Sequence, residues 1–380
     1  MYDPHARRET ALAAKLKERI RQAGPLTIAQ YMQACLTDPE HGYYVRKSAI
    51  GAAGDFITAP EISQVFGELI GLWCAIAWQS MERPRRISLV ELGPGRATLM
   101  RDALRAAAIV PQFLESIDLV FVETNTILRI EQERAFATSP VQPRWCTAGD
   151  IDDENFLPLQ PTIVIANEFL DTRPIRQVVR RGGQWFERLV ALDGNGALQF
   201  ALHDDPLKDF ADPGESAAEG DIIELAEPIT DLTAPLVRRA ANGIPVAGLF
   251  IDYGFTELQA GESLQAVRGH RPEHPLTSPG EADLSAHVDF SALAHAFIAA
   301  GFAIDGPLTQ AEFLGRLGAV ERASRLMNAN PAKAHDIEMG VARLMAVPGM
   351  GDRFKVLGVR SPWLPELPGL ERPWGGRSVR

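Results

Sequence analysis

The chain has 380 residues, of which 46% are hydrophobic and 23% charged, and this composition is typical of a folded globular protein. Its formal net charge is −11. The acidity disfavours binding to nucleic acid, whose phosphates require clustered Lys and Arg. The three cysteines show no spacing typical of a disulfide framework or a zinc site, so the sequence predicts a reducing compartment and no metal centre.

Residues 1–80 precede the first predicted sheet strand and are expected to form an N-terminal extension. Met1 to Gly24 is amphipathic and lacks the apolar core of a secretory signal, so export is not predicted. Val65 to Trp78 is strongly apolar, but it is shorter than the roughly 20 residues that cross a bilayer and it contains Glu68. We expect a buried helix there, no membrane insertion, and a cytoplasmic location in a bacterium or a matrix location in a mitochondrion.

From residue 81 to residue 360, short aliphatic runs alternate with helical stretches, which is typical of a parallel sheet with crossover helices. The predicted strands are Ile87 to Leu92, Ile117 to Glu123, Arg144 to Thr147, Thr162 to Ala166, Gly248 to Asp252 and Phe354 to Val359. This order predicts an α/β fold with a doubly wound, Rossmann-like sheet, in which ligands bind at the carboxyl ends of the strands.

Two regions interrupt the alternation. Residues 175–225 begin with alternating segments around Gly182-Gly183 and Asp193 to Gly196, which predicts inserted antiparallel hairpins. Residues 309–346 have apolar residues at helical spacing, with Pro331 separating two expected helices. Residues 361–380 are rich in Pro, Gly and Trp and are expected to form an irregular tail.

A glycine-rich turn follows the first of these strands, in the segment Glu91-Leu-Gly-Pro-Gly95. Gly93 and Gly95 allow a tight turn and a close approach of the backbone to a ligand, which a Cβ would obstruct. A dinucleotide fingerprint would need a third glycine where Thr98 stands. With Glu91 before the glycines, the pattern is similar to motif I of class I methyltransferases and predicts S-adenosyl-L-methionine as the cofactor.

Two further acidic residues follow the next strands of the predicted sheet. Glu123 ends the second strand, where an acidic residue accepts the ribose hydroxyls, although it lies farther from the glycines than the usual separation of about 20 residues. Asp150 follows the third strand, where this class often contacts the adenine amino group. A glycine pair alone is often an ordinary turn, but carboxylates at three successive strand ends favour a cofactor site.

Several longer motifs are similar to those of one family. They are Asp38 to Tyr44, Gly54 to Glu68, Asn167 to Asp171, Asp252 to Gly254 and Asp283 to Phe290. With the glycine-rich turn, they resemble the MidA family of class I methyltransferases, which includes a mitochondrial arginine methyltransferase that acts in complex I assembly. The resemblance runs from about residue 24 to residue 360 and implies methylation of an arginine on the 49-kDa-type subunit of complex I.

An arginine acceptor needs carboxylates that orient its cationic guanidinium. Glu168 and Asp171 follow the fourth strand and are our candidate acceptor residues, with Asn167 nearer the cofactor. Alternatively, both carboxylates cap the following helix. The resemblance also implies a cofactor lid that uses Asp55 and Thr58, whereas composition alone equally favours a structural loop.

Three other candidates have less specific signals. His41 and His287 are expected to be hydrogen-bonded structural residues rather than bases, and the tyrosines Tyr43, Tyr44 and Tyr253 either line an acceptor channel or pack. Two other functions are compatible with the sequence: a methyltransferase with a small-molecule acceptor, because the fold alone does not select a substrate, and a non-catalytic assembly factor.

Overall fold

The computed structural model describes residues 3, 5–46, 57–151, 153–208, 210, 217–258 and 260–371, and the chain divides into two compact units. The first unit comprises Met1–Phe56, Asp171–Pro228 and Thr256–Asp289, and the second comprises Ile57–Leu170, Ile229–Phe255 and Phe290–Arg380. Among the described residues, no helix is both long enough and apolar enough to cross a membrane.

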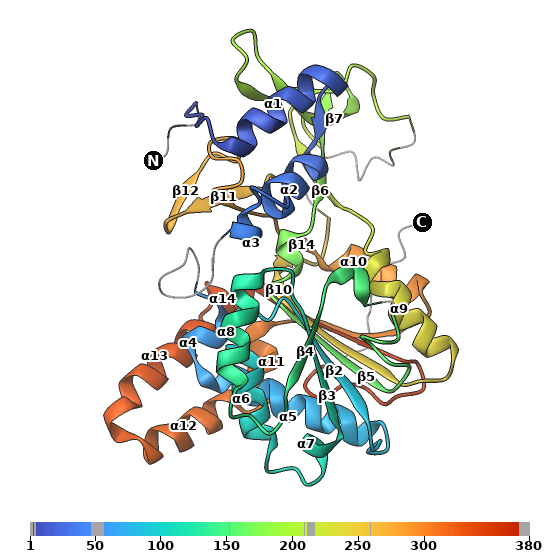
Figure 1. Ribbon diagram of the computed structural model, residues 1–380, viewed down its shortest axis with the longest axis vertical. Coiled ribbons are helices and arrows are strands. Elements are labelled where there is room, and N and C mark those ends of the chain that lie inside the picture. The colour runs from blue at the N-terminus through green and yellow to red at the C-terminus, as the bar shows by residue number, and fades with distance from the viewer. Residues whose placement is uncertain are drawn as a thin grey trace. The chain divides into compact units, whose positions relative to one another are not determined.

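The second unit contains the predicted α/β sheet, whose strands lie in the order β15-β16-β10-β5-β2-β3-β4 (Figure 1). The strands from β10 to β4 pair in parallel, whereas β16 is antiparallel to both β10 and β15. Their bounds are β2 Ile87–Leu92, β3 Ile117–Val122, β4 Pro143–Cys146, β5 Thr162–Asn167, β10 Val246–Phe255, β15 Ala303–Thr309 and β16 Phe354–Arg360. The class I methyltransferase-like sheet is thus confirmed, with β15 added to the predicted strands.

Helices connect and cover these strands. They are α4 Ala59–Ile62, α5 Gln64–Ser80, α6 Thr98–Ala107, α7 Phe113–Ser116, α8 Thr126–Phe136, α9 Thr230–Ala241, α10 Phe290–Ala299 and α14 Met350–Arg353, with 3-10 turns at Ala148–Asp150 and Leu170–Thr172. The inserted helical region forms α11 Gln310–Arg316, α12 Ala319–Ala329, a turn at Pro331–Lys333, and α13 Ala334–Met345. The expected two helices are therefore three, because Gly318, with a left-handed φ of +84°, ends the first of them early.

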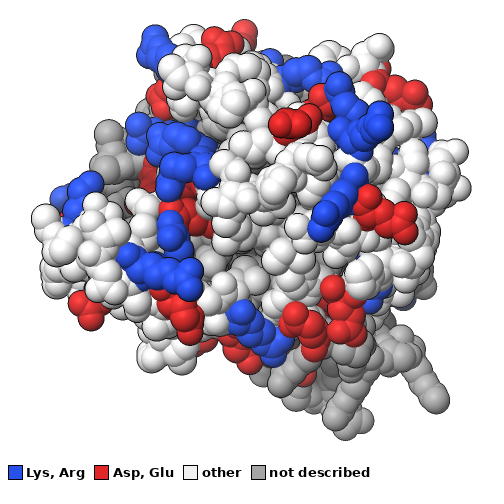
Figure 2. Space-filling view, turned by 90° about the horizontal axis from the view of Figure 1, so that it is seen from below, with Lys and Arg blue, Asp and Glu red and all other residues white. Residues whose placement is uncertain are grey.

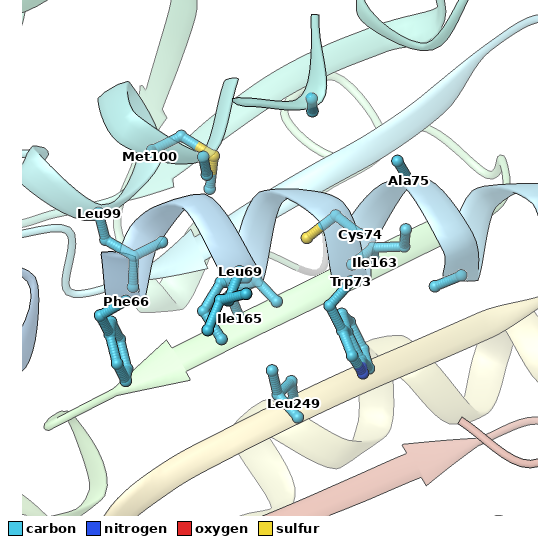
Figure 3. Packing of buried hydrophobic residues seen from close by; sticks show 14 of the residues in the cluster. Phe66, Leu69, Trp73, Cys74, Ala75, Leu99, Met100, Ile163, Ile165 and Leu249 are labelled. Carbon is cyan, nitrogen blue, oxygen red and sulfur yellow. The ribbon is translucent and has the colours of Figure 1, made fainter. Parts of the chain in front are cut away.

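Helix α5 is the buried helix that the sequence predicts. Ser63 caps it by accepting from the Val65 N–H, and its side chains Phe66, Leu69 and Trp73 point toward strand residues such as Ile165 (Figure 3). On its other side, a Cβ at Gly71 would lie 2.1 Å from the Ala103 carbonyl oxygen of α6. The glycine thus allows the two helix backbones to touch, which fixes α6 and the turn before it.

The first unit has its own sheets and core. Its larger sheet has the order β1-β7-β6-β9, with β8 paired to β7, and a smaller one has the order β12-β11-β13. Its elements are α1 Ala11–Ala23, β1 Leu26–Thr27, α2 Ile28–Thr37, α3 Tyr43–Arg46, β6 Ile175–Arg181, β7 Gln184–Leu192, β8 Leu198–Leu202, β9 Ile222–Ala226, β11 Gln265–Arg268, β12 Arg271–Glu273, β13 Asp283–Ser285 and β14 Val288–Asp289. The inserted hairpins are confirmed as β6, β7 and β8.

The compact units differ from the boundaries expected from the sequence. Residues 57–80 cluster with the sheet of the second unit, because α5 buries its apolar face there, whereas Met1–Phe56 cluster with the hairpin region. On the face seen in Figure 2, basic and acidic side chains are interspersed. The negative net charge is therefore not gathered into a single acidic field on that face.

Candidate functional site

The glycine-rich turn follows β2 directly and has a fixed backbone shape. Gly93, Gly95 and Ala97 have left-handed φ angles of +62°, +55° and +59°. The Gly93 N–H donates to the Val122 carbonyl of β3 at 3.1 Å, and the Ala97 N–H donates to the Pro94 carbonyl at 2.7 Å. The turn therefore lies at the carboxyl end of the parallel strands, where open α/β sheets bind ligands.

Gly93 is required for a reason that the sequence did not indicate. A Cβ at this position would lie 2.7 Å from Cδ2 of Phe169, which follows β5. We expected a side chain here to obstruct a ligand, but the ring of Phe169 already occupies that space. The glycine thus allows the turn after β2 to pack against the segment after β5.

Glu91 is a buried carboxyl group at the end of β2, and one of its oxygens has no partner within the described part of the chain. Its side chain is 3% exposed, and burial raises its pKa to about 8. Among the described residues, no hydrogen-bond donor contacts its Oε2 atom. Because an unpaired polar atom is costly to bury, we infer that Glu91 faces a position that a ligand donor completes.

Asn167 presents a second acceptor of this kind from the neighbouring strand. Glu91 pairs with Ile165 across the parallel ladder, so Asn167, two residues farther along β5, points to the same face of the sheet. Its Nδ2 group donates to Glu168 Oε1 at 3.2 Å, while no donor among the described residues reaches its buried Oδ1. The two unpartnered oxygens suit a ligand with several donors, such as an ammonium group.

Glu123 also lies on this face. Glu91 pairs with Phe121 of β3, and Glu123 comes two residues after Phe121, so their side chains point to the same side. Its carboxylate is 8% exposed and is already hydrogen-bonded: Oε1 accepts from the Asn125 N–H at 2.8 Å. Burial raises its pKa, and hydrogen bonds from neighbouring N–H groups oppose that rise. The structure thus brings three predicted strand-end residues to one face.

Gln132 is a residue near this face that the sequence analysis missed. It is fully buried in α8, and its amide donates to the Gly95 carbonyl at 2.7 Å and to Glu123 Oε2 at 3.3 Å. No motif surrounds it in the sequence, and its spacing in a helix is that of an ordinary core position. Only the fold shows that it links the glycine-rich turn to Glu123.

Asp150 lies in the turn after β4, as expected, but its carboxylate is directed at its own chain. Oδ2 accepts from the Thr147 hydroxyl at 2.7 Å and from the Thr147 N–H at 2.8 Å, and these bonds lower the pKa of Asp150. The side chain therefore holds the shape of the turn. Its second oxygen, Oδ1, is the one that a contact to adenine would use.

Glu168 has a strained backbone and a specific hydrogen-bond partner. Its φ is +50°, a conformation that is uncommon without glycine and that often marks functional sites. Its Oε1 atom accepts from the backbone N–H of Ala59 at 2.7 Å. Glu168 thus caps α4, which precedes it by more than a hundred residues.

Asp252, at the end of β10, holds the segment that carries Glu168. It is fully buried, and its Oδ2 atom accepts from the N–H groups of Phe169 at 3.1 Å and Leu170 at 2.9 Å. Oδ1 accepts from the N–H of Tyr253, whose ring packs edge-on against Phe354. The sequence analysis noted Asp252 only as part of a family motif, because its partners are distant in sequence.

Asp171 belongs to the first unit. Its carbonyl accepts from the Ala286 N–H at 2.9 Å. The partly buried Tyr44 hydroxyl donates to Asp283 at 2.9 Å, and desolvation, followed by the charges of Asp283 and Asp171, raises the pKa of Tyr44. Tyr44 also packs edge-on against Tyr43, with ring centroids 5.2 Å apart. Asp171 thus lies close enough to Tyr44 and Asp283 to influence the Tyr44 phenol.

The expected lid is described only in part, since Asp55 lies outside the described residues. Thr58 occupies the N-cap position of α4, although its side chain makes no capping hydrogen bond. Farther along α4, Glu61 lies 3.5 Å from Arg96 of the glycine-rich turn. α4 is therefore tied both to Glu168 and to that turn.

Comparisons with known proteins identify the family of this chain. A family model described as "Putative S-adenosyl-L-methionine-dependent methyltransferase" matches residues 69–308. The "Protein arginine methyltransferase NDUFAF7, mitochondrial" of Xenopus tropicalis is 32% identical over 384 residues, which cover 92% of this chain and 85% of that protein. The human protein of the same name is 32% identical, covering 91% of this chain and 82% of its own length.

A solved structure extends the similarity to three dimensions. The COG1565 superfamily member from Burkholderia thailandensis, bound to S-adenosyl-homocysteine, is 27% identical with a TM-score of 0.81, covering 96% of this chain and 95% of that one. The chain therefore belongs to the family of S-adenosyl-L-methionine-dependent methyltransferases that its resemblance to MidA sequences predicted.

Proposed function

We propose that this protein methylates an arginine of a protein substrate, with S-adenosyl-L-methionine as the methyl donor. The names of the Xenopus and human relatives, which match over more than nine-tenths of the chain, support the arginine acceptor. The unpartnered, buried Glu91 carboxyl beside the glycine-rich turn is the observation that supports the cofactor. The resemblance to MidA proteins supports the 49-kDa-type subunit of complex I as the substrate, and a role in complex assembly.

The cofactor assignment follows from the polar atoms on one face of the sheet. Glu91 and Asn167 would accept hydrogen bonds from the ammonium group of the methionine moiety, and the backbone of the turn at Gly93 and Gly95 would lie against the cofactor. Glu123 would accept the ribose hydroxyls, and Asp150 the adenine amino group. Thr58 and Asp55 would contribute from the lid.

The bound cofactor supplies an electrophilic methyl group on its sulfonium. The protein's task is then alignment, which contributes about 7 to 11 kcal/mol in well-oriented reactions. An arginine side chain stays cationic at physiological pH. We assign Glu168 and Asp171 to orienting that guanidinium and to drawing its charge away from the attacking nitrogen.

The proposed reaction can be tested on whole cells and with purified protein. Mass spectrometry of a deletion strain should show loss of methylation at an arginine of the 49-kDa-type subunit, and purified protein with S-adenosyl-L-methionine should restore it. Unchanged arginine methylation across the proteome would instead favour a small-molecule acceptor. We place the reaction in the bacterial cytoplasm, or in the matrix for an organellar chain, as the mitochondrial relatives support.

Two substitutions of Glu168 separate a catalytic role from a capping role. Glu168→Gln keeps a carbonyl oxygen that can accept from Ala59, whereas Glu168→Ala removes it. If the negative charge orients the acceptor, the glutamine variant should lose at least about tenfold in kcat, since hydrogen bonds to charged groups are worth about 1.5 to 3 kcal/mol. Loss in the alanine variant alone would show that capping α4 is the role of Glu168.

The same variants test whether the protein acts without catalysis. A non-catalytic assembly factor predicts full complex I assembly in a deletion strain that expresses Glu168→Gln. Under the proposed function, that strain should assemble complex I no better than the deletion strain when the glutamine variant is also inactive in the purified assay.

A further inference from the structure

Gln132 connects the ends of three neighbouring strands from a position that is completely buried. Its Nε2 atom lies 2.7 Å from the carbonyl oxygen of Gly95, in the turn after β2, and 3.3 Å from Oε2 of Glu123, after β3. Its Oε1 atom accepts from Nε1 of Trp145, in β4, at 2.7 Å. One amide group thus spans the whole edge to which we assign the adenosine part of the cofactor.

The orientation of this amide is fixed by its partners. An indole N–H can only donate, so the Gln132 oxygen must face Trp145 and the nitrogen must face Gly95 and Glu123. The two hydrogens of the nitrogen then match the two acceptors that it meets. Because burying an amide is costly unless its donors and acceptor are satisfied, this match fixes the position of the Gln132 side chain.

Gln132 also completes the set of partners around the Glu123 carboxylate. Oε1 of Glu123 accepts from Asn125, and Oε2 accepts from Gln132. The Thr124 backbone N–H also hydrogen-bonds to this carboxylate. These bonds fix how the two oxygens are oriented, and two oriented acceptor oxygens suit a ribose with two vicinal hydroxyls.

We propose that Gln132 is a positioning residue, which holds the Glu123 carboxylate and the Gly95 carbonyl in the relative geometry that recognises the ribose hydroxyls of an adenosine ligand. The proposal rests on the proposed function, because it assumes that an adenosine-containing cofactor binds at this edge. It assigns Gln132 no contact with the ligand. Its effect on affinity is transmitted through Glu123, which it anchors to the turn.

The test compares two ligands by isothermal titration calorimetry: S-adenosylhomocysteine and its analogue that lacks both ribose hydroxyls. Gln132→Met keeps a similar volume and removes both donors. We expect this variant to bind S-adenosylhomocysteine about 10- to 100-fold more weakly than the parent protein, as for a hydrogen bond to a charged group. The analogue should bind both proteins with affinities within about threefold, since it does not use Glu123.

A double-substitution cycle adds an independent readout. Because Gln132 acts through Glu123, the Glu123→Gln, Gln132→Met double variant should bind S-adenosylhomocysteine about as weakly as Glu123→Gln alone. Equal losses for both ligands in Gln132→Met, or additive losses in the cycle, would show a packing role and overturn the proposal. Unchanged affinity in Gln132→Met would overturn it as well.

Two controls keep the result interpretable. Far-ultraviolet circular dichroism and thermal unfolding establish that each variant is folded. If Gln132→Met does not fold, Trp145→Phe removes the N–H that orients the amide while keeping an aromatic ring. It should weaken S-adenosylhomocysteine binding by about threefold to tenfold and leave the analogue unaffected, and equal effects on both ligands would refute the proposal. A parent protein that binds neither ligand would contradict the proposed function itself.

Discussion

The ends of β2 and β3 present two buried glutamates on the same face of one sheet, and the two carboxyl groups differ in their hydrogen bonding. Glu123 has hydrogen bonds to both carboxylate oxygens. Glu91 has an oxygen that no described residue contacts as a donor, and burial raises its pKa to about 8. Burial is similar in the two cases, so hydrogen bonding makes the difference. The Glu123 carboxylate is therefore oriented by hydrogen bonds before a ligand binds. The Glu91 carboxyl group, by contrast, should lose its proton and gain a hydrogen-bond partner when the ligand binds.

Gly93→Val should have the largest effect, because it disrupts the β2 end as a structure. Its side chain would meet the Phe169 ring within 2.7 Å at a left-handed φ of +62°, and such overpacking and strain cost about 2 to 4 kcal/mol together. We expect a lower thermal midpoint and no detectable S-adenosylhomocysteine binding. Phe169→Ala in the same chain should recover part of the stability, and no recovery would show that the strain lies elsewhere.

Glu91→Gln should have the next largest effect, and it should act on binding alone. Losing the charge opposite a ligand ammonium should weaken S-adenosylhomocysteine binding by about 10- to 100-fold. Glu123→Gln is the matched control at the β3 end, and its loss should disappear with the analogue that lacks the ribose hydroxyls. If Glu91→Gln weakens binding only of the ligand that has the ribose hydroxyls, the assignment of Glu91 to the ammonium group and of Glu123 to the ribose is wrong.

The smallest expected effect, counted per pH unit, is a pH dependence of ligand affinity that only Glu91 should produce. Below the Glu91 pKa of about 8, the ligand can bind only when Glu91 releases its proton. The affinity for S-adenosylhomocysteine should therefore decrease by up to about tenfold for each unit by which the pH is lowered from 8 to 6. The neighbouring Cys74 thiol should not contribute, because burial raises its pKa well above this range. Calorimetry from pH 6 to pH 8 should show an affinity of Glu91→Gln that does not change with pH. If the affinity of the variant changes with pH as steeply as that of the parent protein, the proton belongs to another group.

The same raised pKa has a consequence for the stability of the ligand-free protein. Between pH 4.5 and about 8, the folded state retains a proton on Glu91 that the unfolded state releases, so the free energy of unfolding should decrease as the pH rises. Glu91→Gln removes this dependence and should therefore be the more stable protein at pH 8. Urea denaturation of both proteins at pH 5 and pH 8 measures the difference.

The sequence predicted those parts of the fold that depend on local pattern. The aliphatic runs that form β2, β3 and β5 were located within one residue at each end, because a buried parallel strand is a nearly continuous apolar run. β15 was missed: Gly306-Pro307 interrupts its pattern, and its register against β16 shifts between Asp305 and Leu308. An antiparallel strand with such an irregularity has no regular alternation to detect.

For the candidate site, sequence patterns located residues but not the contacts between them. Glu91 and Glu123 were predicted as candidates because they stand at the ends of apolar strands. Gln132 could not be found, since its partners come from three other segments. Glu168 was located, but its partner Ala59 belongs to a segment far away in the chain. Hydrogen bonds of this kind are set by tertiary structure, which no local pattern records.

The contacts of Asp252 also bear on the order in which the protein can fold during its synthesis. The turn that carries Glu168 is held by a carboxylate that follows Leu170 by 82 residues, at the end of β10. The glycine-rich turn, by contrast, is bonded to β3, which is made soon after it. A growing chain can therefore form the β2 and β3 edge early, whereas the edge at Asn167 and Glu168 is completed only after residue 252 has left the ribosome and β10 has paired with β5.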